Sequence, residues 1–209
     1  MAKVRRRNVR GEGGQLRQDI IDATIKLIEK SGSCENVSLR AVAKHVGIAA
    51  PSIYPHFADR DELLLAVLKH LFDELVELRS KAEDAVASAG GGPWETLRAG
   101  IFATVKFGLK RPGHYKMLYE GGVISALNDK TAATFGRPIQ LRVMALLAEL
   151  FKGATEKPNV ERLSLLLWVA THGVISLQIN KPTLAWPDAT ALVEDFMRAL
   201  LQPTGSRGI

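Results

Sequence analysis

The sequence predicts an all-α fold of about nine helices, because apolar residues recur at helical spacing along nearly the whole chain. The first such run steps by four, three and four residues through Leu16, Ile20, Ala23 and Leu27. Segments that alternate apolar and polar residues, as a half-buried strand does, are scarce. The 209 residues are 46% hydrophobic and 24% charged, which are globular proportions and exclude disordered and collagen-like classes.

Capping residues, glycine and proline mark where the expected helices begin and end. Ser38 is placed to cap a short second helix, and Asp59 with Glu62 three residues later has the spacing of a capping box for a long fourth helix. Gly136 and Pro138 predict an interruption inside a later helical stretch, because proline lacks a backbone N–H. The expected helices span residues 16–31, 38–46, 50–57, 59–89, 93–110, 114–120, 123–153, 160–180 and 188–201.

Positive charge is concentrated near the N-terminus. The chain carries 28 Lys and Arg against 22 Asp and Glu, a net charge of +6, and residues 1–60 hold 11 of the basic but only 6 of the acidic residues. This excess predicts attraction to a polyanion. The basic start lacks the apolar stretch of a secretory signal, so we expect the mature protein to begin at Met1.

Two further features bear on the cellular compartment. The single cysteine, Cys34, excludes an intrachain disulfide and a cysteine-rich zinc site and favours a reducing cytoplasm. Its thiol is expected to be buried or inert, with a redox sensor as the alternative. Residues 163–180 lack Lys, Arg, Asp and Glu but fall short of about 20 apolar residues, so we expect a helix buried in a core or a subunit interface rather than a membrane span.

Three short helices with a glycine turn between the second and third are the arrangement of a helix-turn-helix, which places one helix in the DNA major groove. The relevant pieces are Leu39-x-x-Val42-Ala43-x-x-Val46-Gly47-Ile48, then Ser52-Ile53-Tyr54-x-His56-Phe57, then Asp59-Arg60-x-Glu62-Leu63. These pieces strongly resemble the signature of the tetracycline-repressor (TetR) family of transcriptional regulators. The resemblance implies a DNA-binding domain at residues 15–60, and the basic residues before it predict a flexible arm at residues 1–14.

The resemblance also implies which residues meet DNA, with Pro51 to Phe57 as the recognition helix. Arg40 matches a position that can reach a guanine edge, and a solvated surface arginine is the alternative. The expected base-facing residues are Ala50, Pro51 and Ser52. Tyr54 and His56 match positions that bind phosphate, and packing in the core is the alternative for both. We expect further phosphate contacts from Lys44 and Arg60. From its charge alone, the arm is expected to place Arg5, Arg6 and Arg7 in a neighbouring minor groove, and a disordered, solvated tail is the alternative.

Two residues depart from the family pattern. Ala49 stands where Ser or Thr commonly caps the recognition helix, a loss of about 1 kcal/mol of helix stability. Pro55 disfavours helical geometry at Tyr54, so we expect the recognition helix to kink or end early.

The remaining residues, 61–209, exceed what a helix-turn-helix needs for support. The strings Trp168-Val-Ala-Thr-His172-Gly173 and Pro112-Gly113-His-Tyr115-Lys-Met117 resemble the ligand-binding domain of a TetR subgroup marked by a Trp, His, Gly motif. This second resemblance implies a helical ligand-binding and dimerisation domain whose last two helices pair with those of a twofold mate. The expected dimer contacts are Trp168, Ile175, Leu192, Phe196 and Leu200.

The expected effector is a largely apolar small molecule with one or two polar handles. The pocket candidates, each of which could equally be ordinary core, are Phe102, Phe107, Tyr115, Tyr119, Met144, Trp168 and His172. For His172, a neutral core histidine is the alternative, and a metal ligand is disfavoured because no His or Asp stands at a workable spacing.

An enzyme is the main competing class, but the HExxH, GxxxxGK and GxSxG patterns are absent from the sequence. The Gly11–Gly14 run is a weak phosphate-loop candidate and fits a hinge to the arm better. We expect no catalytic residue, no metal and no cofactor. The sequence predicts a cytoplasmic homodimer that binds a near-palindromic operator as a repressor and is released by a small molecule; repression rests on the resemblance alone. A ligand-independent architectural DNA-binding protein is the alternative.

Overall fold

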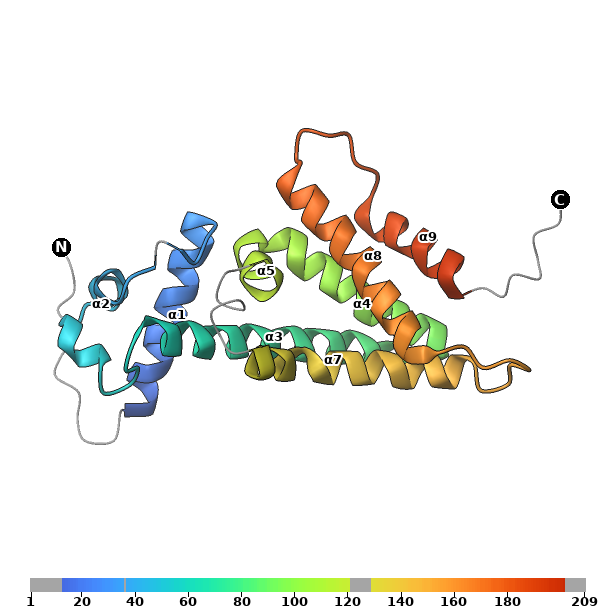
Figure 1. Ribbon diagram of the computed structural model, residues 1–209, viewed down its shortest axis with the longest axis horizontal. Coiled ribbons are helices and arrows are strands. Elements are labelled where there is room, and N and C mark those ends of the chain that lie inside the picture. Colours follow the sequence, from blue (N-terminus) through green and yellow to red (C-terminus); the bar gives the residue numbers. More distant parts are fainter. Residues whose placement is uncertain (1–12, 36, 121–128, 202–209) are drawn as a thin grey trace. The chain divides into compact units, whose positions relative to one another are not determined.

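The computed structural model describes residues 13–35, 37–120 and 129–201 (Figure 1). Within these residues the secondary structure consists of eight α-helices and one short 3-10 helix, with no strand, which confirms the all-α prediction. Nearly all of the predicted basic arm, including Arg5, Arg6 and Arg7, lies outside the described residues. The chain divides into two compact units. Unit 1 comprises residues 1–73 and 111–135, and unit 2 comprises residues 74–110 and 136–209.

Unit 1 contains the predicted helix-turn-helix. Its elements are α1 (Gly13–Ser31), α2 (Leu39–Val46), the 3-10 helix η1 (Ala50–Ile53), the first part of α3 (Arg60–Ser88) and α5 (Pro112–Tyr119). Helix α1 packs against both α2 and α5, and α2 packs against η1. The fully buried apolar side chains of this core are Ile20, Ile28, Val42, Ile53, Phe57, Leu63, Leu64, Val67, Leu68, Leu71 and Leu118. Burial of this set stabilises unit 1 through the hydrophobic effect.

Local capping fixes the ends of these helices. Ser38 Oγ accepts a hydrogen bond from the Ala41 amide at 3.2 Å, and Gly47 ends α2 in the left-handed conformation with φ of +80°. At the start of α3, the Glu62 amide donates to Asp59 Oδ1 at 2.8 Å. The Glu62 carboxylate accepts in turn from the Ala58 amide, which completes a reciprocal cap and confirms the predicted start of this helix.

The segment predicted as the recognition helix is shorter than expected. Instead of a helix over residues 50–57, the structure has the four-residue 3-10 helix η1, followed by a turn in which the Phe57 amide donates to Ile53 O at 3.0 Å. Pro51 and Pro55 cannot donate backbone hydrogen bonds, and Ala49 provides no side-chain cap, so a regular α-helix has few bonds to gain here. Tyr54 nevertheless keeps helical dihedrals, with φ of −59° and ψ of −30°.

Unit 2 is a set of packed helices formed by the rest of α3, α4 (Pro93–Lys110), most of α7 (Asp129–Leu150), α8 (Val160–Asn180) and α9 (Ala189–Leu201). Helix α8 packs against α4 and α9, and α4 also packs against α9. The bounds predicted for α4 and α8 are confirmed. The predicted interruption of α7 is wrong: Pro138 lies inside a continuous helix, where it is exposed, so the lost backbone hydrogen bond disturbs no packed face.

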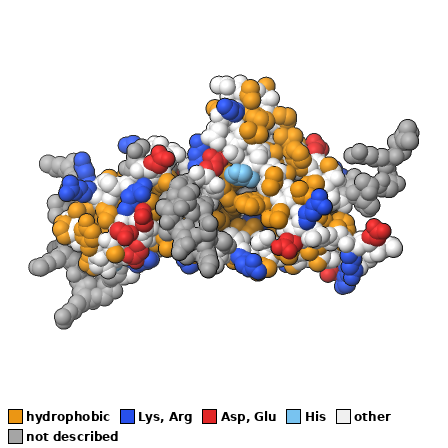
Figure 2. All heavy atoms as spheres, in the orientation of Figure 1, with side chains coloured by type: hydrophobic (Ala, Val, Ile, Leu, Met, Phe, Trp, Pro, Cys, Tyr) orange, Lys and Arg blue, Asp and Glu red, His pale blue; other side chains and the backbone are white. Residues whose placement is uncertain are grey.

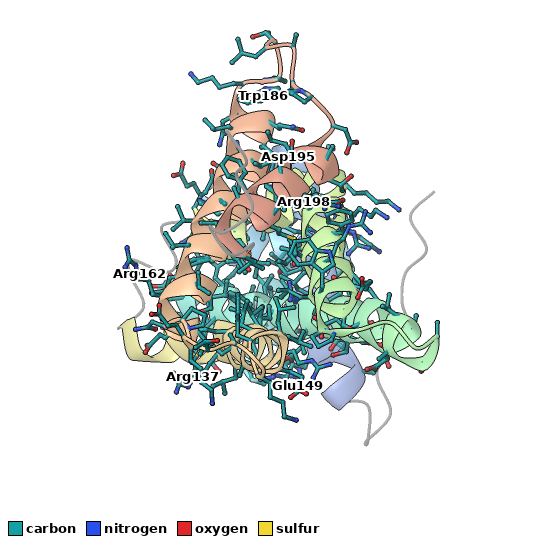
Figure 3. The ribbon with its side chains drawn as sticks, turned by 90° about the vertical axis from the view of Figure 1, so that its right-hand side faces the viewer. Arg137, Glu149, Arg162, Trp186, Asp195 and Arg198 are labelled. Atoms are coloured by element: carbon teal, nitrogen blue, oxygen red, sulfur yellow. The ribbon has the colours of Figure 1, made fainter. Side chains whose placement is uncertain are left out.

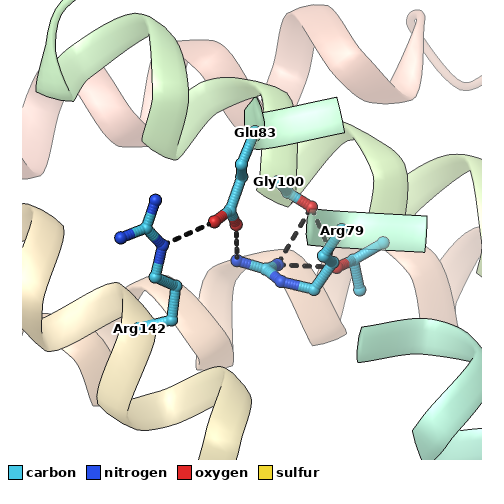
Figure 4. A network of polar contacts seen from close by, with 5 residues as sticks. Arg79, Glu83, Gly100 and Arg142 are labelled. Carbon is cyan, nitrogen blue, oxygen red and sulfur yellow. Dashed lines mark hydrogen bonds and ion pairs between the residues drawn. The ribbon is translucent and has the colours of Figure 1, made fainter. Parts of the chain in front are cut away.

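A buried ionic network ties three helices of unit 2 together (Figure 4). The Arg79 guanidinium of α3 donates to Gly100 O at 2.9 Å and to Thr104 Oγ1 at 2.8 Å, both on α4. It also donates to Glu83 Oε1 at 3.2 Å, and Arg142 of α7 donates to the other Glu83 oxygen at 2.9 Å. A Cβ added at Gly100 would clash with Glu83 Oε1, so the absence of a side chain at Gly100 leaves room for the Glu83 carboxylate beside α4.

Candidate DNA-binding site and ligand-binding region

Helix α2 presents two cations on one exposed face. Arg40 and Lys44 stand four residues apart, one turn of the helix, and both are exposed. The apolar side of the same helix faces the core through Val42 and Ala43, so the helix is held with its cations outward. An exposed guanidinium and an exposed ammonium in this arrangement can bind a phosphate or the edge of a base.

The η1 segment adds a second exposed surface. Tyr54 exposes 57% of its surface, which is unusual for a large aromatic residue, whereas Phe57 is fully buried under the guanidinium of Arg17 at 4.7 Å from the ring centroid. Pro51 is exposed, and Ala50, Ser52 and His56 are partly exposed. The predicted DNA contacts of this segment are therefore at the surface, and Tyr54 is not a core residue.

Arg60 is engaged differently from the other predicted contacts. Its Nε donates to Val37 O at 2.8 Å, and its Nη2 donates to Cys34 O at 2.8 Å and to Glu35 O at 3.3 Å. Its Nη1 lies 3.6 Å from Asp61 Oδ1. Three of the five N–H groups of the guanidinium are thus directed at the connection between α1 and α2. Local sequence patterns give no signal for this role, because the acceptors lie 23 to 26 residues away.

Cys34 is buried within unit 1. Burial raises the pKa of its thiol, because the anionic thiolate is the form that desolvation disfavours. The predicted inert thiol is favoured over a redox sensor, since sensor cysteines need an accessible thiolate.

The pocket candidates are divided between the two units. Unit 1 holds Tyr115 and Tyr119 of α5, whose ring centroids lie 4.8 Å apart, and Phe72 packs edge-on against Tyr119 at 5.9 Å. Burial raises the pKa of the Tyr115 hydroxyl. Phe72 joins this aromatic cluster without having been predicted as a site residue, because it falls on the buried stripe of α3.

The other five candidates belong to unit 2. The Arg98 guanidinium lies 4.4 Å from the centroid of the partly exposed Phe102 ring, whereas Phe107 is buried. Met144 and His172 are partly exposed, and Trp168 exposes 52% of its surface. No group of three His, Cys, Asp or Glu that could hold a metal occurs among the described residues.

Helices α8 and α9 carry an exposed apolar face, named here the α8–α9 face. Its members are Leu165, Leu166, Trp168, Val169 and Leu177 of α8 and Phe196 of α9, each with between 37% and 64% of its surface exposed. Figure 2 shows hydrophobic side chains gathered over these two helices. A patch of this kind marks an interaction surface in a soluble protein. Among the predicted dimer contacts, Ile175 is corrected: it is fully buried in the protomer and belongs to the core.

Ion pairs hold α9 in place beside α4. Glu194 of α9 accepts hydrogen bonds from Arg98 of α4 at 2.8 Å and from Arg198 on its own helix at 2.6 Å. The Arg198 and Arg98 guanidiniums hold the pKa of Glu194 below its usual value.

In the connection between α8 and α9, Trp186 Nε1 donates a hydrogen bond to Lys181 O at 2.9 Å. Figure 3 shows Trp186 in this connection and Arg198 on α9.

Among the described helices, α8 is the one long and apolar enough to cross a membrane by length and composition. This is weak evidence for a span, because core and interface helices meet the same criteria. Because α8 packs against α4 and α9, a helix of the core or of an interface, as predicted, is favoured over a membrane span.

Comparison with known families and structures gives a consistent result. Residues 20–67 match the model described as bacterial regulatory proteins, tetR family, and residues 97–200 match the tetracyclin repressor-like C-terminal domain. A transcriptional regulator from Pseudomonas aeruginosa PAO1 is similar in fold, with 17% identity, coverage of 91% of this chain and 92% of that chain, and a TM-score of 0.74.

Two further similar structures carry ligands. FadR from Bacillus subtilis in complex with stearoyl-CoA has 14% identity, coverage of 88% of this chain and 97% of that chain, and a TM-score of 0.69. FadR from Thermus thermophilus, a transcriptional repressor in complex with lauroyl-CoA, has 17% identity, coverage of 92% and 97%, and a TM-score of 0.67. At these identities the similarity establishes the fold.

Proposed function

Because the chain belongs to the tetR family of bacterial regulatory proteins and is a DNA-binding transcriptional regulator, we propose that it represses transcription from a near-palindromic operator as a homodimer. The observation that carries this proposal is the exposed surface of α2 and η1, on which Arg40, Lys44 and Tyr54 stand outward from a buried core. We propose that the protein acts in the cytoplasm and is not an enzyme.

Each residue of this surface has a proposed role. Arg40 reads a guanine edge, because its planar fork matches the two acceptors that guanine shows in the major groove. Ala50, Pro51 and Ser52 face bases, where small groups fit against a thymine methyl or several base edges. Lys44, Tyr54 and His56 bind phosphate oxygens and set the register of the protein on the duplex. The arm residues Arg5, Arg6 and Arg7 enter the adjacent minor groove.

The α8–α9 face is proposed to form the homodimer interface. The proposed interface includes two members of this face, Trp168 and Phe196, which are exposed in the protomer. It also includes the partly exposed Leu192 and Leu200 of α9. A twofold axis through this face doubles the DNA-binding surface, so that each copy reads one half-site about 34–36 Å from the other.

The effector is proposed to be a largely apolar small molecule with a polar end. Long-chain acyl-CoA thioesters are the first class to test, because two proteins of similar fold bind stearoyl-CoA and lauroyl-CoA. Their acyl chain is the part that matches an apolar lining, whereas the coenzyme A head is large and anionic. Within unit 2 the proposed contacts are Phe102, Phe107 and Met144, with His172 as a polar handle and Trp168 as a contact shared with the dimer interface. Within unit 1 they are Tyr115 and Tyr119. Binding lowers operator affinity if the effector prefers the conformation that fits DNA poorly.

The test is selection of random duplex DNA by the purified protein, followed by salt titration of binding to the enriched duplex and to a scrambled duplex. We expect enrichment of a near-palindrome, bound at least about a thousandfold more tightly than the scrambled duplex. Addition of lauroyl-CoA or stearoyl-CoA then tests release. Equal, salt-sensitive binding to both duplexes would refute the operator proposal and favour a ligand-independent architectural protein.

A further inference from the structure

We propose that Arg60 is a positioning residue that fixes the direction of helix α2 on DNA, rather than one that binds a phosphate. The inference rests on the proposed DNA-binding role of α2. Arg60 is the first residue of α3, and its side chain is 38% exposed. Its hydrogen bonds nevertheless run into the protein, to three carbonyl oxygens of the connection that precedes α2.

These three carbonyls belong to the residues that lead directly into α2. Cys34 and Val37 are both buried, with 6% and 5% of their surfaces exposed, and the Val37 amide donates to Cys34 O at 3.2 Å. Cys34, Glu35 and Val37 thus belong to a hydrogen-bonded turn, and the Arg60 guanidinium donates further hydrogen bonds to their carbonyl oxygens. A planar guanidinium can hold several carbonyls at once because its N–H groups have fixed directions.

The turn is connected rigidly to the DNA-binding face. Val37 directly precedes Ser38, the N-cap of α2, and the Val42 amide donates to Ser38 O at 3.0 Å. Arg40 is in the first turn of this helix, and Lys44 follows one turn later. Because α2 is only eight residues long and is capped at both ends, a change in direction at Val37 moves both cations together.

The charge of Arg60 is also partly balanced. Its Nη1 is 3.6 Å from Asp61 Oδ1, and the neighbouring carboxylate would repel an approaching phosphate. A phosphate contact would have to compete with this ion pair, and the other two nitrogens already donate to carbonyls.

The experiment compares Arg60→Lys and Arg60→Ala with the wild-type full-length protein on the selected operator and its scrambled control, over a salt series. A phosphate contact needs charge, so lysine would preserve it. The turn needs the guanidinium fork, which lysine lacks. We expect both variants to lose about tenfold or more in operator affinity, the equivalent of one charge-assisted hydrogen bond, with little loss on the scrambled duplex.

The salt dependence separates the two roles. Removal of a phosphate contact from both subunits lowers the slope of log affinity against log salt by about 1.8, and Lys44→Ala serves as the positive control for this change. We expect the slopes of both Arg60 variants to match the wild type. The loss in operator-to-scrambled ratio should also be smaller in an Arg40→Ala background, because Arg60 acts in part through Arg40.

Several outcomes overturn the inference. Wild-type affinity of Arg60→Lys together with a reduced slope for Arg60→Ala would establish a phosphate contact. Equal losses on both duplexes would indicate general destabilisation instead of positioning, and circular dichroism of the lysine variant shows whether the fold is intact. A wild-type protein that does not prefer its selected duplex would refute the operator proposal and this inference with it.

Discussion

Glu83→Gln tests the buried network of unit 2 most directly. The Glu83 and Arg79 side chains are 2% and 6% exposed, so Glu83→Gln removes the carboxylate charge that pairs with the buried Arg79 guanidinium. Breaking a buried pair in this way costs about 3–5 kcal/mol. For a chain of this length each kcal/mol corresponds to about 2–4 °C in Tm, so we expect a decrease of roughly 6–20 °C.

Glu77→Gln on the same helix is the matched control. Glu77 pairs with Lys81 at 2.6 Å, but the two side chains are 65% and 71% exposed, so water screens the pair and the decrease in Tm should be much smaller than that of Glu83→Gln. Thermal unfolding followed by circular dichroism, at one fixed protein concentration because dimerisation shifts Tm, compares the two variants. Equal shifts in Tm would refute the reasoning. The double variant Arg79→Met, Glu83→Leu should regain most of the loss, because an apolar pair leaves no buried charge.

Three further predictions concern the other parts of the molecule. Gly47→Ala should destabilise the protein by about 1–2 kcal/mol, because φ at this position is +80°; an unchanged urea midpoint would contradict this. Val169→Glu, at a residue 64% exposed on the α8–α9 face, should convert a dimer into a folded monomer in sedimentation experiments, whereas Leu141→Glu, at a residue 49% exposed on α7, should leave the dimer intact. Cys34 should react slowly with iodoacetamide at pH 8 and faster at higher pH, because burial raises the pKa of its thiol. The free energy of unfolding should also decrease above about pH 8.5, because there the thiol ionises in the unfolded chain but not in the folded one. Alkylation at the rate of a free thiol would refute burial of Cys34.

Signals that act within a few residues were predicted well from the sequence. The Ser38 cap and the paired Asp59 and Glu62 each depend on hydrogen bonds between neighbours in the chain, so the residue types alone specify them. The recognition segment shows where this reasoning is incomplete. Pro51 and Pro55 were expected to disturb a helix, and the structure has a 3-10 turn with Tyr54 still in the helical region, because backbone bonds from His56 and Phe57 to Ile53 hold the turn.

Helical phase alone did not separate core from surface on α8. Trp168 and Ile175 are seven residues apart, so they project from nearly the same side of the helix, and both were predicted as dimer contacts. Trp168 is 52% exposed, whereas Ile175 is fully buried. The difference arises because burial depends on which parts of the neighbouring helices reach each turn of α8. That information is in the tertiary packing and not in the spacing of apolar residues.

Arg60 and Arg79 show that the surroundings of charged residues are also hard to predict from the sequence. Arg60 follows a DNA-binding motif, so the sequence favours a phosphate contact for its charge, yet its N–H groups donate to the carbonyls of Cys34, Glu35 and Val37. Arg79 falls on a long helix where solvent exposure is the usual expectation, yet it donates to Gly100 and Thr104 of α4. In both cases the acceptors lie more than 20 residues away along the chain. A guanidinium has enough donors to join distant segments, so the function of an arginine depends on the carbonyls and carboxylates that folding brings to it.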